Sequence, residues 1–349
     1  MSCILPISIV VILGVLPRHL LPVPDTERKR DWRMTADRTV ITSRAAPAET
    51  RKRRGIEIKD RTWKWILLLP AVIVVVILLA APVIWTLYAA FTDVHLYRLG
   101  VPTKFVGLAN FRKLMVSDYF WRTVRNTLLF MAGAVPTELL IGLLVSICLN
   151  NIEKGRKLFR TWFLMPMMMS PVVVSFIVGR MLFQEDVGPI NEILRALGFK
   201  GIPWLTTRTW AMVALIVIDV WQASSFLILM LMAGLQSIPL DLYEAALVDG
   251  ANRWQTFWRI TIPLLIPIGG TALLVRMIDA FKVVDIIMVL TGGGPGQATE
   301  SVTLAIYRTG VKGGDLAFGS SQAYLLLMFM LVFGGLYLYM TRRAMGQKG

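Results

Sequence analysis

Residues 237–267 read SIPLDLYEAALVDGANRWQTFWRITIPLLIP and predict two helices joined by a break. Pro239 followed by Asp241 is typical of a helix start, and Gly250 is typical of a helix end because glycine tolerates a left-handed backbone. A second helix is expected after Gly250, and Pro263 is expected to end it. That helix presents three aromatic side chains on one face: Trp254, Phe257 and Trp258. Aromatic side chains of this size on a hairpin indicate burial against a partner protein.

Long apolar stretches lie on both sides of this hairpin. A helix that crosses a bilayer needs about 20 mostly apolar residues, and six stretches meet this length. They run approximately over residues 66–91, 124–149, 159–183, 210–235, 266–290 and 320–340. Because these runs are continuous and do not alternate with polar residues, helices are expected rather than barrel strands. The predicted fold class is an all-α, polytopic membrane protein with six transmembrane helices.

The composition excludes several classes of protein. Hydrophobic residues make up 56% of the 349 residues and charged residues 17%, and the mean hydropathy is +0.63. Soluble domains carry about 25% charged residues, so this chain has too little polar surface for a soluble fold and is too apolar for a disordered one. The formal charge of +15 is not read as a nucleic-acid signal, because no soluble basic domain carries it.

No catalytic or metal-binding arrangement stands out. The two cysteines, Cys3 and Cys148, lie far apart in apolar runs, so neither a disulfide framework nor a metal site is predicted. The two histidines, His19 and His95, belong to no recognisable pair of nucleophile and base. We therefore expect a protein that is not an enzyme and that holds no cofactor or metal of its own.

Residues 1–61 are basic and poor in large apolar side chains, which predicts a largely disordered cytoplasmic extension. The apolar stretch at residues 4–16 is short and has no basic residues before it, so it fits neither a signal peptide nor a span. Met34 is an alternative start of the chain. The six-helix transmembrane domain is placed at residues 62–341, and a cytoplasmic tail at residues 342–349.

The distribution of Lys and Arg predicts the orientation. With the N-terminus in the cytoplasm, the cytoplasmic segments carry 23 of the 37 Lys and Arg, and the external loops carry 10. Basic residues accumulate on the cytoplasmic side of membrane proteins. One short loop shows the same bias by itself, with Lys154, Arg156, Lys157 and Arg160. Both termini and the hairpin at residues 237–267 are therefore expected in the cytoplasm.

The hairpin resembles the EAA loop of ABC importer permeases. The residues that carry the resemblance are Glu244-Ala245-Ala246, Asp249-Gly250 and Ile260-Thr261-Ile262-Pro263, at the spacing of that loop. The family pattern has Leu where this chain has Ile262, and Asp249 before Gly250 is similar to the sugar-importing, maltose-type branch. Three further segments resemble that branch: residues 105–111, 159–171 and 281–295.

The resemblance implies the ABC importer permease fold and a subunit of a binding-protein-dependent sugar importer in the bacterial inner membrane. Membrane subunits of this family work in pairs, with two copies of an ABC ATPase inside and a solute-binding protein outside. The chain has no G-x-x-x-x-G-K-[ST] sequence to hold phosphates, so a partner would hydrolyse ATP. The residues expected to couple this chain to the ATPase are Glu244, Ala245, Ala246, Asp249, Gly250, Ile260 and Pro263.

Polar residues inside the fourth and fifth predicted spans are candidates for the solute pathway. Charges within a membrane are costly and mark either a pathway or an internal pair. On the fourth span Asp219, Gln222 and Phe226 share a face, with Trp221 beside them. On the fifth span Arg276, Asp279 and Lys282 share a face, and Asp285 lies on an adjacent face. Hydrogen-bonding groups beside aromatic rings suit a sugar. The alternative is that Arg276–Asp279 and Lys282–Asp285 are structural ion pairs between packed helices.

Other functions stay open at this point. A permease of the same family could import an amino acid, a phosphate or a peptide, although the match of Asp249-Gly250 and of residues 291–295 to the sugar branch disfavours it. A secondary transporter driven by an ion gradient would fit the charges inside the spans, but it gives no reason for the hairpin. Lipid is an expected partner, and nucleic acid is not.

Overall fold

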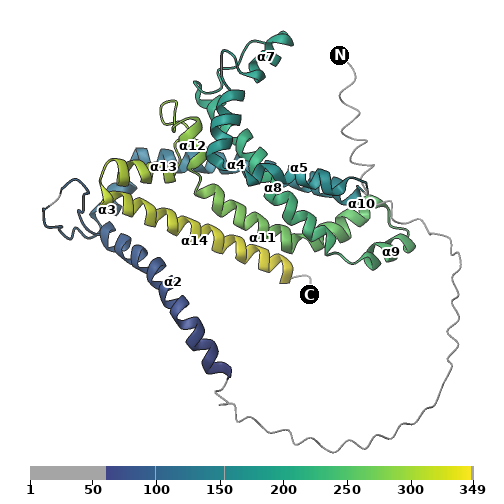
Figure 1. Ribbon diagram of the computed structural model, residues 1–349, viewed down its shortest axis with the longest axis horizontal. Helices are drawn as coiled ribbons and strands as arrows, with labels where there is room; N and C mark the ends of the chain where they lie inside the picture. The colour runs from purple at the N-terminus through teal and green to yellow at the C-terminus, as the bar shows by residue number, and fades with distance from the viewer. Residues whose placement is uncertain (1–59, 99, 153, 347–349) are drawn as a thin grey trace, which may run out of the picture. The chain divides into compact units, whose positions relative to one another are not determined.

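The computed structural model describes residues 60–98, 100–152 and 154–346, and this part of the chain is built from helices (Figure 1). The one β-bridge within it joins Thr92 to Phe105. The basic extension predicted at residues 1–61 and the proposed start at Met34 lie outside the described residues, apart from the first two residues of α2. The elements are α2 (Asp60–Ala90), α3 (Ala109–Met115), α4 (Asp118–Asn151), α5 (Arg156–Met168), α6 (Pro171–Val173), η1 (Val174–Arg180), α7 (Pro189–Ala196), α8 (Arg208–Gln236), α9 (Leu240–Val248), α10 (Arg253–Thr256), η2 (Phe257–Thr261), α11 (Ile262–Phe281), α12 (Asp285–Leu290), α13 (Val302–Ile306), η3 (Tyr307–Lys312) and α14 (Leu316–Gly346).

The prediction of an all-α polytopic membrane protein is confirmed. Among the described residues, five helices are long and apolar enough to cross a membrane, and a bent pair of helices makes a sixth candidate. The predicted first, second, fourth and sixth spans correspond to α2, α4, α8 and α14. Residues 85–346 belong to one compact unit, whereas residues 60–84 of α2 belong to another.

The prediction of a continuous third span is wrong. The chain bends by 88° between Arg156–Met168 and Pro171–Arg180. Met169 and Ser170 have extended backbone, with ψ angles of 142° and 135°. The residue before a proline avoids the helical region, so Pro171 accounts for the extended backbone at Ser170. Two short helices on either side of this break replace the predicted span.

The fifth span also differs from its prediction. Pro263 does not end the second helix of the hairpin, because α10, η2 and α11 continue as one helical run over Arg253–Phe281. The π-helical turn η2 precedes the proline, and its Ile262 N–H donates to the carbonyl of Phe257. A widened turn of this kind accommodates a proline that cannot donate a backbone hydrogen bond. The run then stops at Phe281, and α12 begins at Asp285 after a short break.

Three helices, α4, α8 and α11, pack closely around one another. Gly142 of α4 lies so close to α8 that an added Cβ would come within 2.9 Å of the Leu227 Cβ. Gly234 of α8 faces Leu265 of α11 in the same way, at 2.7 Å. Small residues permit this close approach between membrane helices, where packing rather than a hydrophobic driving force holds helices together. The three helices form the frame on which the functional features are placed.

Candidate functional site

A buried ion cluster joins these three helices. Arg276 of α11 donates from Nε and Nη2 to the two carboxylate oxygens of Glu138 on α4, at 2.5 and 2.8 Å. Its Nη2 also donates to Asp219 Oδ2 on α8. Glu138 has no exposed surface, and Asp219 and Arg276 are each 6% exposed. One guanidinium therefore links the second, fourth and fifth spans through paired and buried charges.

The pairing corrects the ion pairs considered from the sequence. Arg276 pairs with Glu138 and Asp219 rather than with Asp279. Lys282 pairs with Asp279, at 3.4 Å and one helical turn away, and both side chains are more than half exposed. Asp285 begins α12 beyond the break and is exposed. Glu138 was missed as a partner because nothing in its own segment identifies which helix it faces.

Polar side chains of α8 donate hydrogen bonds to backbone carbonyls of the broken third span. The Gln222 side chain donates from Nε2 to the carbonyl oxygen of Met169, at 2.9 Å, where the helical hydrogen bonding is interrupted. One turn further along, Ser225 donates to the carbonyl of Phe163 at 2.7 Å. A carbonyl without a partner is costly in a membrane, so Gln222 stabilises the backbone at the break, and Ser225 ties α8 to α5. Phe226 instead packs against the apolar cluster around Leu227 and Leu231.

A cavity of about 560 Å³ lies between α4, α5 and α8. Trp162 and Trp221 contribute two indole rings to it, and Ser224 and Ser225 contribute hydroxyl groups. The remaining lining is apolar: Ile141, Phe163, Met165, Pro166, Met169, Val217, Val220 and Ile228. Of the residues predicted for the solute pathway, Trp221 lies in this cavity, whereas Asp219 and Arg276 are held in the ion cluster next to it.

Gly250 ends α9 as the sequence predicts. Its φ is +76°, and its N–H donates to the Leu247 carbonyl at 3.1 Å. The next amide, that of Ala251, donates to the Ala246 carbonyl at 2.9 Å. These two bonds form a Schellman motif, which requires a left-handed residue at the position of Gly250. An added Cβ would meet nothing within 4 Å, so the backbone angle, not space, demands glycine there.

The two arms of the hairpin are joined by a hydrogen bond. The Tyr243 hydroxyl on α9 lies 3.1 Å from the Thr261 hydroxyl on η2. Ala246 on the same arm is buried, whereas Glu244, Ala245 and Asp249 are exposed. The contact therefore joins α9 to the start of the helical run that forms the fifth span.

The second arm begins with a capping box. Asn252 accepts from the Gln255 N–H, and the Gln255 side chain accepts from the Asn252 N–H, both at 2.9 Å. The three aromatic rings predicted on one face do cluster, with centroids 5.2 to 6.4 Å apart. Trp254 and Trp258 are 59% and 50% exposed. Figure 1 shows α9 and α10 at the end of the bundle where α5 begins and α14 ends.

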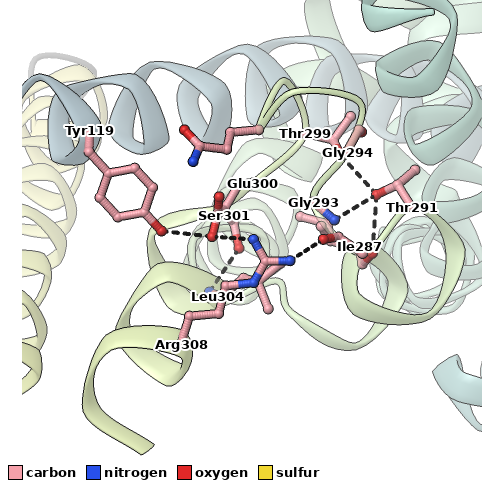
Figure 2. Close-up of polar contacts among 12 residues, drawn as sticks. Tyr119, Ile287, Thr291, Gly293, Gly294, Thr299, Glu300, Ser301, Leu304 and Arg308 are labelled. Carbon is pink, nitrogen blue, oxygen red and sulfur yellow. Dashed lines mark hydrogen bonds and ion pairs between the residues drawn. The ribbon is translucent and has the colours of Figure 1, made fainter. Parts of the chain in front are cut away.

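A second polar network holds the glycine-rich loop at residues 291–296. Glu300 has no exposed surface and accepts hydrogen bonds at Oε1 from the Tyr119 hydroxyl at 2.7 Å and from Arg308 Nη1 at 2.8 Å. Arg308 also donates to the carbonyl of Gly292, and Thr299 donates to that of Gly294 at 2.6 Å. Figure 2 shows the Arg308 side chain between Glu300 and the loop. The sequence indicated the loop but not this network, because its members lie far apart along the chain.

A family described as "Binding-protein-dependent transport system inner membrane component" matches residues 138–346. The chain belongs to this family. The matched region of this permease starts at Glu138 of the ion cluster and includes the whole hairpin.

The relatives of this permease include transporters for several sugars. It is 38% identical over 279 residues to the trehalose/maltose transport system permease protein MalF of Thermococcus litoralis, covering 80% of this chain and 93% of the relative. It is 34% identical over 289 residues to the sulfoquinovosyl glycerol transport system permease protein SmoG of Agrobacterium fabrum, covering 83% and 93%. A chain in the crystal structure of a bacterial alginate ABC transporter has a TM-score of 0.71 and 26% identity, covering 81% of this chain and 96% of that one.

Glu138→Gln is expected to destabilise the permease more than Asp219→Asn. Glu138 makes two bonds to the guanidinium and Asp219 makes one, so neutralising Glu138 leaves the buried arginine with the poorer partner. Removing one member of a buried ion pair costs about 3–5 kcal/mol, and Glu138→Gln is expected near the upper end of this range and Asp219→Asn near the lower end. Thermal unfolding of the purified full chain measures both variants. Equal destabilisation would contradict the assignment of Glu138 as the main ion partner.

Proposed function

We propose that this chain is one of two membrane subunits of an ATP-driven sugar importer. The observation that carries the proposal is the hairpin: its Gly250 motif, its exposed α9 and its hydrogen bond to the fifth span have the form of a coupling element. Family membership and the sugar names of several relatives support it. The proposed partners are a second permease subunit, two copies of an ABC ATPase and an extracytoplasmic solute-binding protein.

The hairpin is proposed to dock on the ATPase through its exposed surface. Leu247 and Val248 of α9 are 53% and 87% exposed, and an apolar surface of this kind is typical of a protein contact. The acidic side chains of α9 and its end are exposed around them: Asp241, Glu244 and Asp249. The location of α9 at the end of the bundle where the basic start of α5 lies supports a cytoplasmic position for the hairpin. Both termini are then cytoplasmic.

The proposed coupling route runs from α9 to the cavity through one hydrogen bond and the ion pairs of Arg276. Closure of the ATPase dimer displaces α9, and the contact between Tyr243 and Thr261 carries the displacement into the fifth span. Arg276, on the same helical run, holds α4 and α8 through Glu138 and Asp219. Rigid-body movement of packed helices is a common way to connect distant sites. The cavity wall on α8 moves with this frame.

The cavity is proposed as this subunit's share of the solute pathway. Indole rings such as Trp221 and Trp162 present flat apolar faces, which suit the apolar faces of a sugar ring, and the Ser224 hydroxyl can bond a sugar hydroxyl. The proposed roles of Asp219 and Arg276 are indirect, through the position of α8. Asp279, Lys282 and Asp285 are exposed near the other end of the fifth span and stay candidates for solute contact there.

Gly250→Pro is expected to abolish ATP-dependent sugar uptake while leaving membrane insertion intact. Proline fixes φ near −65° and cannot adopt the +76° of Gly250, so α9 would leave its position. Uptake into proteoliposomes containing all proposed subunits measures the effect. The matched control is Gly335→Ala on α14, where an added Cβ meets nothing within 4 Å. Uptake by this chain alone, driven by an ion gradient, would contradict the proposed function.

Trp221→Ala is expected to lower sugar uptake about tenfold without changing the amount of assembled complex. The variant removes an indole face from the cavity, and an aromatic face in contact with a ligand contributes on the order of 1–2 kcal/mol. Phe176→Ala provides the control, because Phe176 is a 57% exposed aromatic residue outside the cavity lining. If both variants reduced uptake to the same extent, the cavity would have no special role.

A further inference from the structure

Basic side chains gather where α5 begins. Lys154 precedes the helix, and Arg156, Lys157 and Arg160 lie at its start. Arg156 and Arg160 are four residues apart and share a face, with Lys157 beside them. Lys154, Lys157 and Arg160 are exposed, and none of them pairs with a carboxylate among the described residues. Glu153, the acidic residue of this segment, lies outside the described residues.

The turn between α4 and α5 fixes where these cations lie. Gly155 has a φ of +79°, a backbone angle that glycine adopts readily and that lets the chain turn sharply after α4. The Arg156 Nη2 donates to Asn150 Oδ1 on α4, at 3.1 Å. Further along α5, the carbonyl of Phe163 accepts from Ser225 of α8. Because α5 is tied to α4 at its start and to α8 beyond, its basic face keeps a fixed direction.

An apolar and exposed stripe on α5 begins directly beside the cations. Leu158, Trp162 and Met165 follow one another at intervals of four and three residues and therefore share a face. They are 71%, 73% and 56% exposed. An exposed apolar face on a helix that begins with basic residues is typical of a position at the membrane surface, with the apolar side among acyl chains. Because a helix rises only about 1.5 Å per residue, the cations lie close to the level of the lipid headgroups.

The charge of the hairpin separates this surface from the proposed ATPase contact. Asp241, Glu244 and Asp249 are exposed on α9 and at its end, at the same end of the bundle (Figure 1). A partner surface that complements these acidic side chains is basic and would repel the cations of α5. Arg253 and Arg259 on the second arm are exposed too, but six residues of helix place them on different sides of the run, so they form no shared site. The cations of α5 thus call for an anionic partner of their own.

We propose that the start of α5 binds the headgroup of an anionic phospholipid in the cytoplasmic leaflet. Lys154, Lys157 and Arg160 contact the phosphate, and an acyl chain lies along Leu158 and Met165. Clusters of Lys and Arg at the cytoplasmic end of a membrane helix attract anionic lipids, and hydrogen bonds from charged donors to phosphate are short and strong. The leaflet follows from the orientation proposed for the hairpin, whereas the binding itself does not depend on which solute is transported.

The test measures lipid bound to the purified full chain in an uncharged detergent. Dioleoylphosphatidylglycerol and dioleoylphosphatidylcholine are titrated separately, and native mass spectrometry gives the dissociation constant of the first bound lipid. A basic residue near an anionic lipid contributes about 1 kcal/mol, which is about fivefold in affinity. Replacing Lys154, Lys157 and Arg160 together with Gln is therefore expected to weaken phosphatidylglycerol binding on the order of 100-fold and to leave phosphatidylcholine binding unchanged. Undiminished phosphatidylglycerol binding in this triple variant would overturn the proposal.

A matched variant removes the same charge elsewhere. Lys104, Arg112 and Lys200 are exposed and pair with no carboxylate in the described part of the chain, so their triple replacement by Gln is the control and is expected to bind phosphatidylglycerol as the unaltered chain does. The double variant Lys154→Arg and Lys157→Arg keeps the charge and is expected to keep the affinity. Equal losses in the two triple variants would show that net charge alone attracts the lipid, and the site would be refuted.

A measurement on the unaltered chain keeps the proposal testable if a variant fails to fold. Raising the ionic strength from about 0.05 M to about 0.5 M screens exposed charges, so the preference for phosphatidylglycerol over phosphatidylcholine is expected to fall. Inorganic phosphate at the same ionic strength is expected to displace no more lipid than chloride does, because phosphate gains nothing from the apolar face of α5. A preference that is insensitive to salt, or full displacement of the lipid by phosphate, would contradict a lipid headgroup site.

Discussion

The buried guanidinium of Arg276 is the interaction on which the rest of this membrane domain depends. An arginine inside a span is tolerated only with partners, and here Glu138 and Asp219 come from two other helices. The requirement to keep all three charges together fixes how α4, α8 and α11 pack. The same cluster borders the neighbouring cavity, because Val220 follows Asp219 in sequence and lines its wall.

The position of the hairpin follows from this frame. Its second arm is continuous with the fifth span, so the π-helical turn and Arg276 lie on one helical run. A hydrogen bond from Tyr243 to Thr261 connects α9 to this run. Gly250 lets α9 fold back sharply, and Tyr243 ties it to the base of the span. At the other end of the bundle, Glu300 and Arg308 hold the glycine-rich loop in a fixed conformation. A closely packed core of helices is thus joined to an exposed hairpin.

Local patterns predicted much of this structure. Hydrophobic length indicated the spans, and the glycine at position 250 indicated the end of α9, because both depend on neighbouring residues alone. The break before Pro171 and the continuation of the helix through Pro263 were missed. Each depends on which groups bond to backbone carbonyls that lose their helical donor near a proline, as the Gln222 side chain bonds to the carbonyl of Met169. The partners of Arg276 could not be predicted, because helix spacing says which residues share a face but not which helix that face meets.

The most direct test of the account measures whether the hairpin controls access to the cavity. A cysteine in place of Trp221, in a complex without other reactive cysteines, is exposed to a membrane-impermeant thiol reagent on the external side. The account predicts rapid labelling when the ATPase is trapped with ATP, slow labelling without nucleotide, and no difference between the two states when Gly250→Pro is also present. Labelling that is independent of nucleotide in the otherwise unmodified complex would contradict it.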